Sequence, residues 1–365
     1  MGLSGSRGRS PTRPSHCQCF DLFRASGSPA RPHQITIGRR ERLLKKGEFY
    51  LHRRRTHTNL LVETDTDKPM LENIQKLEIP GCVRVAADQG GLAKIVVTSR
   101  FSTAEIYPHG AHITHFQKNG EPPLIFLSRK SFFQSDKAIR GGIPICFPWF
   151  GAREGNVMHG VARLSEWELT ETTAAPDGSV KLNFLLPAKS LTQAGWPAAK
   201  VNFIVTVAEK LTMELSVANA TTQDFIFEDC LHSYFSVGDI TQVAITGLKG
   251  LSYLDKVDHF ARKLETGDAI KIGSEVDRVF LNATGPVEIQ DAKWRRTISL
   301  EKSGSASAVV WNPWIEKAAG MADFGAEEYQ GMVCVEAGNV GDSKITLAPG
   351  KSASLKVILS SKPLS

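Results

Sequence analysis

Apolar and polar side chains alternate along much of the chain after about residue 80. In the segment 211–217, Leu, Met, Leu and Val alternate with Thr, Glu and Ser, and the segments 180–186 and 201–207 repeat this period of two. A period of two places every second side chain on one face, so each segment is expected to be a half-buried β-strand. Further strands are expected at 93–99, 104–117, 243–248, 287–292, 296–302, 307–311, 332–336, 343–347 and 352–360.

Helical periodicity is hardly seen, and turn residues separate many of these segments, as at Pro176, Asp177 and Gly178. Many short strands joined by turns are typical of sandwiches. The pattern therefore predicts an all-β fold, a large antiparallel β-sandwich. Because no internal repeat and no second change in composition appears, residues 80–363 are expected to form one domain.

The first part of the chain has a different composition. Residues 1–79 are expected to be a disordered basic leader, since the first 60 residues are rich in Arg and Ser, poor in acidic residues and interrupted by Pro. They lack the apolar h-region of a secretory signal. Two interpretations stay open, an organellar transit peptide or a disordered extension with a wrongly assigned start. The expected location is the cytoplasm, or a chloroplast or other organelle if the leader is a transit peptide.

The net charge of +6 is unevenly distributed. Residues 1–60 hold 13 Lys or Arg and 3 Asp or Glu, and the remaining 31 basic and 35 acidic residues give the rest of the chain a charge of −4. A sequence-independent nucleic-acid binder needs its basic surface on the folded domain, so no nucleic-acid partner is expected. No segment approaches the roughly 18 consecutive apolar residues of a spanning helix, so no membrane partner is expected either.

The cysteine pattern indicates neither a disulfide framework nor a metal site. The six cysteines are at positions 17, 19, 82, 146, 230 and 334, and the first two have no second pair at the spacing of zinc ligands. Cys146, Cys230 and Cys334 lie in apolar runs, which favours buried free thiols in a reducing compartment.

Five segments break the alternation and concentrate Gly, Pro, aromatic and charged residues: IRGGIPICFPWFG (139–151), HGVAR (159–163), LHSYFSVG (231–238), VVWNPWIEKAAGMADFG (309–325) and VCVEAGN (333–339). In this order they resemble the hexose-6-phosphate mutarotases, or glucose-6-phosphate 1-epimerases, of the aldose 1-epimerase superfamily. The resemblance covers about residues 85–360, and WNPW with GMADF is typical of this phosphosugar branch. It implies the galactose mutarotase-like supersandwich, in which one face stays open to the sugar.

The resemblance implies that the protein interconverts the α and β anomers of a hexose 6-phosphate. It assigns the base to Glu336 and the acid to His232. These residue types suit the reaction, since a carboxylate is ionised at pH 7 and an imidazole titrates close to it, so the two can hold opposite protonation states. No cofactor and no metal is expected.

The resemblance also implies a set of substrate-binding residues. Arg140 and Arg163 match the phosphate-site arginines, and Asp255 matches a carboxylate that holds sugar hydroxyls. Guanidinium groups bind phosphate through charge-assisted hydrogen bonds. Met158 is a departure, because related sequences can place a glutamine there, and a thioether donates no hydrogen bond. His159 is expected either to contact the ligand or to orient its neighbours.

Two questions stay open at this level. Four aromatic residues could stack on a pyranose or anchor the core and loops: Phe147, Trp149, Trp311 and Trp314. The alternatives to the mutarotase are a non-catalytic sensor of sugar phosphates and a mutarotase of unphosphorylated aldoses. Retention of both His232 and Glu336 counts against the sensor, and the two arginines count against the unphosphorylated substrate. A monomer is expected.

Overall fold

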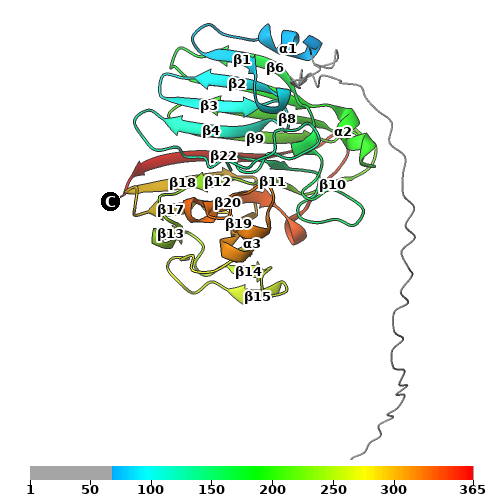
Figure 1. The fold of residues 1–365 in the computed structure, drawn as a ribbon. Coiled ribbons are helices and arrows are strands. Elements are labelled where there is room, and N and C mark those ends of the chain that lie inside the picture. The colour runs from blue at the N-terminus through cyan, green and yellow to red at the C-terminus, as the bar shows by residue number, and fades with distance from the viewer. Residues whose placement is uncertain (1–67, 365) are drawn as a thin grey trace, which may run out of the picture. The chain divides into compact units, whose positions relative to one another are not determined.

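The computed structural model of the protein describes residues 68–364, drawn as a coloured ribbon in Figure 1. Its first element is helix α1 (Lys68–Gln75), and Ile74 of this helix is buried in the hydrophobic core. The folded part therefore begins before residue 80, where the sequence pattern placed the boundary. The rest of the expected leader, residues 1–67, lies outside the described residues.

The described residues confirm the all-β prediction with two eight-stranded antiparallel sheets. In the first sheet the order is β13-β17-β18-β22-β9-β8-β7-β6. Its strands are β6 (Glu168–Ala174), β7 (Val180–Leu186), β8 (Lys200–Val207), β9 (Leu211–Ala218), β13 (Val243–Thr246), β17 (Val287–Asp291), β18 (Arg296–Ser303) and β22 (Ser352–Pro363).

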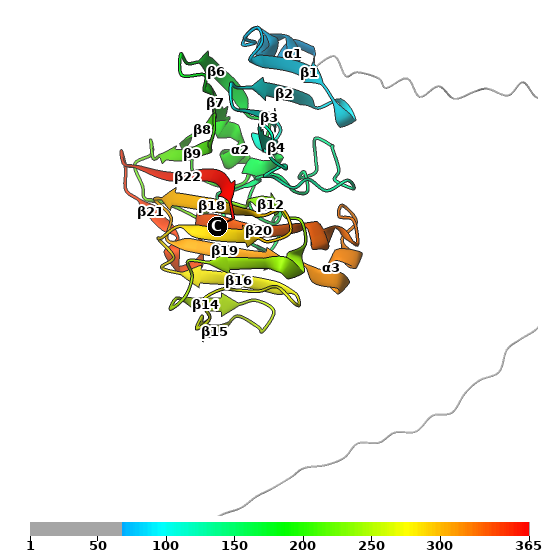
Figure 2. The ribbon, with the colours of Figure 1, turned by 90° about the vertical axis from the view of Figure 1, so that its left-hand side faces the viewer.

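The second sheet has the order β15-β14-β16-β19-β20-β11-β5, and β12 also pairs with β20. Its strands are β5 (Ile145–Cys146), β11 (Asp229–Leu231), β12 (Tyr234–Ser236), β14 (Ser252–Asp255), β15 (Ala261–Leu264), β16 (Val276–Leu281), β19 (Ser307–Asn312) and β20 (Met332–Asn339). Figure 2 shows β14, β16, β19 and β20 side by side, with helix α3 (Trp314–Gly320) at one end of these strands.

Two smaller sheets complete the strand inventory of residues 68–364. One contains β1 (Val83–Ala87), β2 (Ala93–Thr98), β3 (Ser102–Tyr107) and β4 (His112–Lys118), and the other pairs β10 (Phe225–Phe227) with β21 (Ile345–Leu347). The single strand expected at 104–117 is thus wrong, because β3 and β4 are separate. Pro108 interrupts it, and Gly110 and Ala111 have φ angles of 78° and 44°, which reverse the chain.

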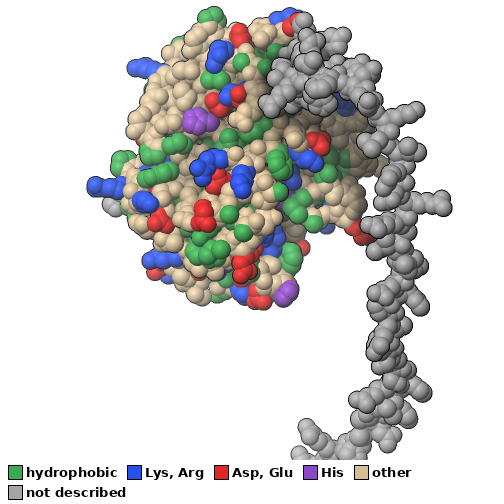
Figure 3. Space-filling view, in the orientation of Figure 1, with side chains coloured by type: hydrophobic (Ala, Val, Ile, Leu, Met, Phe, Trp, Pro, Cys, Tyr) green, Lys and Arg blue, Asp and Glu red, His purple; other side chains and the backbone are tan. Residues whose placement is uncertain are grey.

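Helices are few and short. Besides α1 and α3 the described residues form α2 (Ala188–Gln193) and 3₁₀ turns at Gln89–Gly91, Ala162–Leu164, Ile240–Gln242, Glu328–Gly331 and Gly341–Ser343. None of the helices in residues 68–364 is long and apolar enough to cross a membrane. On the face of the molecule drawn in Figure 3, acidic and basic side chains are interspersed, with no broad basic area.

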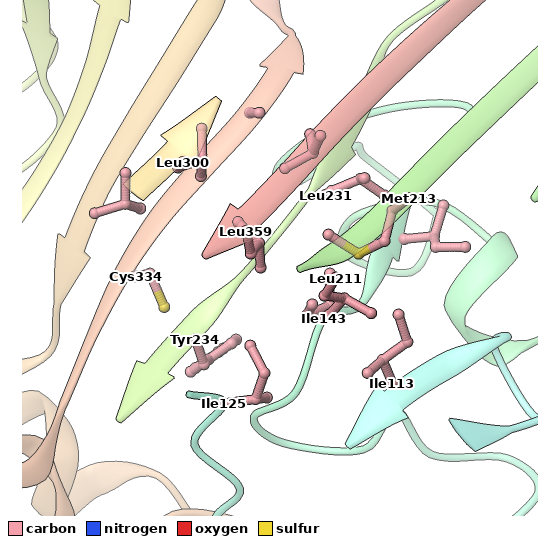
Figure 4. Close-up of a cluster of buried hydrophobic side chains, with 14 of the residues drawn as sticks. Ile113, Ile125, Ile143, Leu211, Met213, Leu231, Tyr234, Leu300, Cys334 and Leu359 are labelled. Atoms are coloured by element: carbon pink, nitrogen blue, oxygen red, sulfur yellow. The ribbon is translucent and has the colours of Figure 1, made fainter. Parts of the chain in front are cut away.

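The main core cluster contains side chains of both large sheets and of the four-stranded sheet β1–β4. Leu211, Met213, Leu300 and Leu359 of the first sheet belong to the same buried cluster as Leu231 of the second, and Figure 4 shows part of it. Burying one face of the second sheet leaves the other face of its strands to form a binding surface.

Candidate active site

A cavity of about 710 Å³ lies on the outer face of the second sheet. Antiparallel cross-strand partners point to the same face of a sheet, and Glu336 of β20 pairs with Val309, Val309 with Val279, and Val279 with Leu254. All four side chains line the cavity. The row of partners therefore forms its floor, with the carboxylate at one end and apolar side chains beyond it.

Loops and strand ends supply the walls. The other lining residues that bear on the chemistry are Arg140, Phe150, Met158, His159, Glu228, His232, Tyr234, Lys256, Phe260, Asp277, Trp311, Lys317 and Met321. They come from segments far apart in the sequence, and together with Glu336 they include five of the seven predicted site residues.

His232 and Glu336 contact each other at the cavity. The Nε2 atom of His232 lies 3.2 Å from Oε1 of Glu336, and the two residues are 8% and 1% exposed. The backbone N–H of His232 donates to the carbonyl oxygen of Pro144, and its ring stacks on Tyr234 with centroids 4.8 Å apart. The predicted acid and base are therefore brought together and held by their surroundings.

Burial shifts both members of this pair toward their neutral forms. It raises the pKa of Glu336 well above its usual range, although a hydrogen bond from the Cys230 thiol acts in the opposite direction. Burial, and then the positive surroundings created by His159, Arg163 and Arg140, lower the pKa of His232 well below its usual range. Burial thus favours the neutral carboxyl group and the neutral imidazole in this contacting pair.

Arg140 points into the cavity from the loop before β5. Its Nε and Nη2 atoms each lie 3.1 Å from Oδ2 of Asp323, and its Nη1 donates to the hydroxyl of Tyr234 at 3.1 Å. One carboxylate and one phenol hold the guanidinium group in place. Arg140 has five N–H donors, so some of them stay available to a ligand.

Arg163 lies behind the loop that carries Met158. Its Nη2 donates to the carbonyl oxygen of Met158 at 2.7 Å, while its Nε is buried without a hydrogen-bond partner among the described residues. It does not line the cavity directly. Burial, together with the charge of Arg140, lowers its pKa. Arg140 and Arg163 together make the electrostatic potential of this region positive.

Met158 and His159 both line the cavity. The Met158 side chain is 53% exposed, and its carbonyl oxygen is the group that contacts Arg163. The Nδ1 atom of His159 accepts a hydrogen bond from the backbone N–H of Gly151, and the ring lies edge-on to His232 with centroids 5.5 Å apart. Burial lowers the pKa of His159 well below its usual range, so this ring is neutral beside the acid–base pair.

Asp255 is not brought to the cavity with the others. Leu254 lines it, and the next residue along a strand points to the opposite face. The Asp255 carboxylate instead forms an ion pair with Lys263, at 2.8 Å. Asp277 of β16, opposite Trp311, lines the cavity and forms an ion pair with Lys256 at 2.9 Å. Sequence reasoning missed Asp277, and the available signal was an acidic residue inside the apolar run VDRVFL.

Of the four aromatic candidates, Trp311 is the one that lines the cavity. Phe147 is buried against Phe227, with ring centroids 5.3 Å apart. The rings of Trp149 and Trp196 stack 6.0 Å apart, and Trp314 packs on Tyr329 at 5.2 Å. These three are anchors of the core and loops.

One group of residues has donors suited to a metal ion. Ligand atoms of His232, Cys334 and Glu336 lie within 4.8 Å of one another. His232 and Glu336 already contact each other, however, and the arginines that lower the pKa of His232 would also repel a cation. Cys146, Cys230 and Cys334 are buried free thiols, as predicted.

Comparison with known proteins identifies the family. Residues 94–360 match the aldose 1-epimerase family. The chain belongs to this family. Over 288 residues it is 38% identical to a protein of Cenchrus ciliaris provisionally named glucose-6-phosphate 1-epimerase, covering 75% of the chain and 86% of that relative.

Bacterial members of the aldose 1-epimerase family show the same relationship. A Salmonella typhimurium protein with the same provisional name is 33% identical over 66% of the chain and 81% of its own length. The crystal structure of a provisionally assigned mutarotase, YeaD, from Salmonella typhimurium superposes with a TM-score of 0.73, at 29% identity, over 80% of the chain and 99% of that structure. The mutarotase-like sandwich expected from the motifs is confirmed.

Proposed function

We propose that this isomerase of the aldose 1-epimerase family interconverts the α and β anomers of hexose 6-phosphates such as glucose 6-phosphate. The observation that carries the proposal is a buried His232–Glu336 pair, 3.2 Å apart, in a cavity that also contains a guanidinium group, that of Arg140. The names of the Cenchrus ciliaris and Salmonella typhimurium relatives agree with it. A monomer is proposed, acting in the cytoplasm, or in a chloroplast or other organelle if residues 1–79 are a transit peptide.

The reaction requires one proton to leave the anomeric hydroxyl and another to reach the ring oxygen, the two oxygens that are bonded to C1. Glu336 takes the proton from the anomeric hydroxyl, His232 gives one to the ring oxygen, the bond between C1 and the ring oxygen breaks, and C1 becomes an aldehyde. After rotation about the C1–C2 bond, the protonated carboxyl and the neutral imidazole run the same steps in reverse on the other face. A pair that holds one proton supplies one acid and one base at each stage.

The substrate's phosphate also prepares this pair. In the free protein, Arg140 and Arg163 help to lower the pKa of His232. A phosphate dianion bound by these arginines offsets their charge and so favours the protonated imidazole. The proton then moves from Glu336 to His232, which gives the base and acid their working forms. Trp311 and Val309 offer apolar surface to the C–H groups of the sugar.

The direct test uses pure α-glucose 6-phosphate and the full chain. We expect the protein to accelerate the approach to anomeric equilibrium, followed by polarimetry or by magnetisation-exchange NMR. Binding of glucose 6-phosphate without acceleration would favour the non-catalytic sensor. Acceleration with glucose and none with glucose 6-phosphate would favour a mutarotase of unphosphorylated sugars.

The arginine assignment predicts a substrate-dependent loss. Replacing Arg163 with Ala should raise the KM for glucose 6-phosphate roughly thirtyfold and change kcat/KM for glucose less than about threefold, because the attraction between its positive charge and the phosphate is lost only with the phosphorylated sugar. The control is Arg153→Ala, which removes an exposed guanidinium that lies over the rings of Trp149 and Trp196. An equal loss with both sugars would contradict the phosphate assignment.

The two aspartates provide a matched pair of variants. Asp277→Asn should raise the KM for glucose 6-phosphate about tenfold, because a hydrogen-bond acceptor facing the sugar hydroxyls loses its charge. Asp255→Asn should leave both kinetic constants within about twofold, since its carboxylate lies on the opposite face of its strand and pairs with Lys263. Steady-state anomerisation rates decide between them, and the reverse order would return Asp255 to the binding site.

A further inference from the structure

Three thiols lie on the same face of the second sheet as Glu336. Cys230 is opposite Gly338, Cys334 is opposite Trp311, and Cys146 is opposite Cys230. All three are 0% exposed and are not among the lining residues of the cavity. We propose that Cys230 is a positioning residue for Glu336, holding the catalytic carboxylate in place through a thiol hydrogen bond from the neighbouring strand.

The contacts of the carboxylate carry this proposal. The Sγ atom of Cys230 lies 3.3 Å from Oε2 of Glu336, while Oε1 faces Nε2 of His232 at 3.2 Å. Each carboxylate oxygen therefore has its own partner. His232 lines the cavity, whereas Cys230 is buried outside its lining. When the sugar comes between His232 and Glu336, the contact from Cys230 is the one that remains. A carboxylate that is 1% exposed would otherwise keep a buried oxygen without a partner.

A buried thiol suits this task chemically. Burial raises the pKa of Cys230 well above its usual range, so the S–H group stays protonated and donates throughout the working pH range. Its donated hydrogen bond favours the ionised form of Glu336 and offsets part of the cost of burial. A thiol is a weak donor, so it steadies the base without suppressing its basicity.

Other groups surround Glu336 and would respond to the same titration. These are His232 between β11 and β12, Cys334 on β20, Cys146 on β5, Tyr234 on β12, Asp277 on β16 and Lys256 after β14. Asp277 raises the pKa of Glu336 and Lys256 lowers it. The Cys230 variants must therefore change the contact with Glu336 and leave these groups in place.

The experiment compares Cys230→Ala, Cys230→Ser and Cys146→Ala by the pH dependence of kcat for glucose 6-phosphate, which reports the substrate complex, where Glu336 is the base. Cys146 is the matched control, because it is the buried cross-strand partner of Cys230 and makes no hydrogen bond to Glu336 among the described residues. Without the donor the ionised carboxylate is less favoured, so the pKa of Glu336 rises. In Cys230→Ala the acid limb of the profile should move to higher pH, with kcat about tenfold lower at pH 7 and KM nearly unchanged.

Serine replaces the donor, so Cys230→Ser should restore kcat to within about threefold of the parent and return the acid limb to its original position or below it. Cys146→Ala should keep the parent profile. The proposal is overturned if Cys230→Ala keeps the parent acid limb, or if Cys146→Ala shifts the limb equally. The proposal for Cys230 rests on the proposed function, and the two are refuted by different results. A parent protein that does not accelerate anomerisation refutes the function, whereas an active parent with the variant results above refutes only the role of Cys230.

Discussion

Glu336→Gln is expected to lower kcat for anomerisation of glucose 6-phosphate by about a thousandfold, because an amide cannot accept the proton of the anomeric hydroxyl and general acid–base groups contribute roughly 10²–10⁴ each. The amide has nearly the shape of the carboxylate, so its oxygen can still accept from Cys230. The KM should change little. Magnetisation-exchange NMR measures the residual rate above the spontaneous reaction.

A second cavity carboxylate provides the control for this variant. Glu228 also lines the cavity, but its carboxylate accepts hydrogen bonds from the backbone N–H groups of Phe150 and Gly341. Glu228→Gln should therefore reduce kcat less than about tenfold. If the two variants lost activity equally, or if Glu336→Gln kept the parent rate, Glu336 would not be the base. A melting temperature close to that of the parent shows that the loss is chemical.

The sequence pattern predicted the strands whose two faces differ. Strands β7, β8 and β9 alternate buried and partly exposed side chains throughout, so a period of two is visible in them. Strand β16 was missed, because five of its six side chains are buried and no alternation remains. Such strands pack against the core on one face and form the cavity floor on the other, so the functional part of the sheet carries the weaker signal.

The weak sequence signal of this sheet also explains why Asp255 was predicted as a site residue and Asp277 was missed. His232 and Glu336 could be predicted because each lies in a distinctive motif, and the register of β20 brings them together. Choosing Asp277 over Asp255 requires the pairing of β14 with β16, which places Leu254 opposite Val279. A shift of one residue turns a side chain to the other face. The register of β14 on β16 cannot be derived from the composition or from the order of the motifs.

The second large loss is expected in His232→Gln, which should lower kcat about a hundredfold or more, because Gln can donate a hydrogen bond to the ring oxygen but cannot transfer a proton. The double variant with Glu336→Gln should be hardly slower than the slower single variant. Acid and base act in one step, so removing either already disables the pair, and such effects are not additive. Stopped-flow polarimetry of the four proteins closes the cycle.

The neighbouring histidine separates this role from a general effect of the ring. The ring centroids of His159 and His232 are 5.5 Å apart, and His159 accepts a hydrogen bond from the backbone N–H of Gly151. His159→Gln should therefore lower kcat less than about tenfold and keep both limbs of the pH profile of kcat. His232→Gln should abolish the basic limb, because in the substrate complex that limb reports loss of the proton from the acid. Additive losses in the double variant would mean that His232 and Glu336 act independently, and the shared proton inferred from their 3.2 Å contact would be wrong.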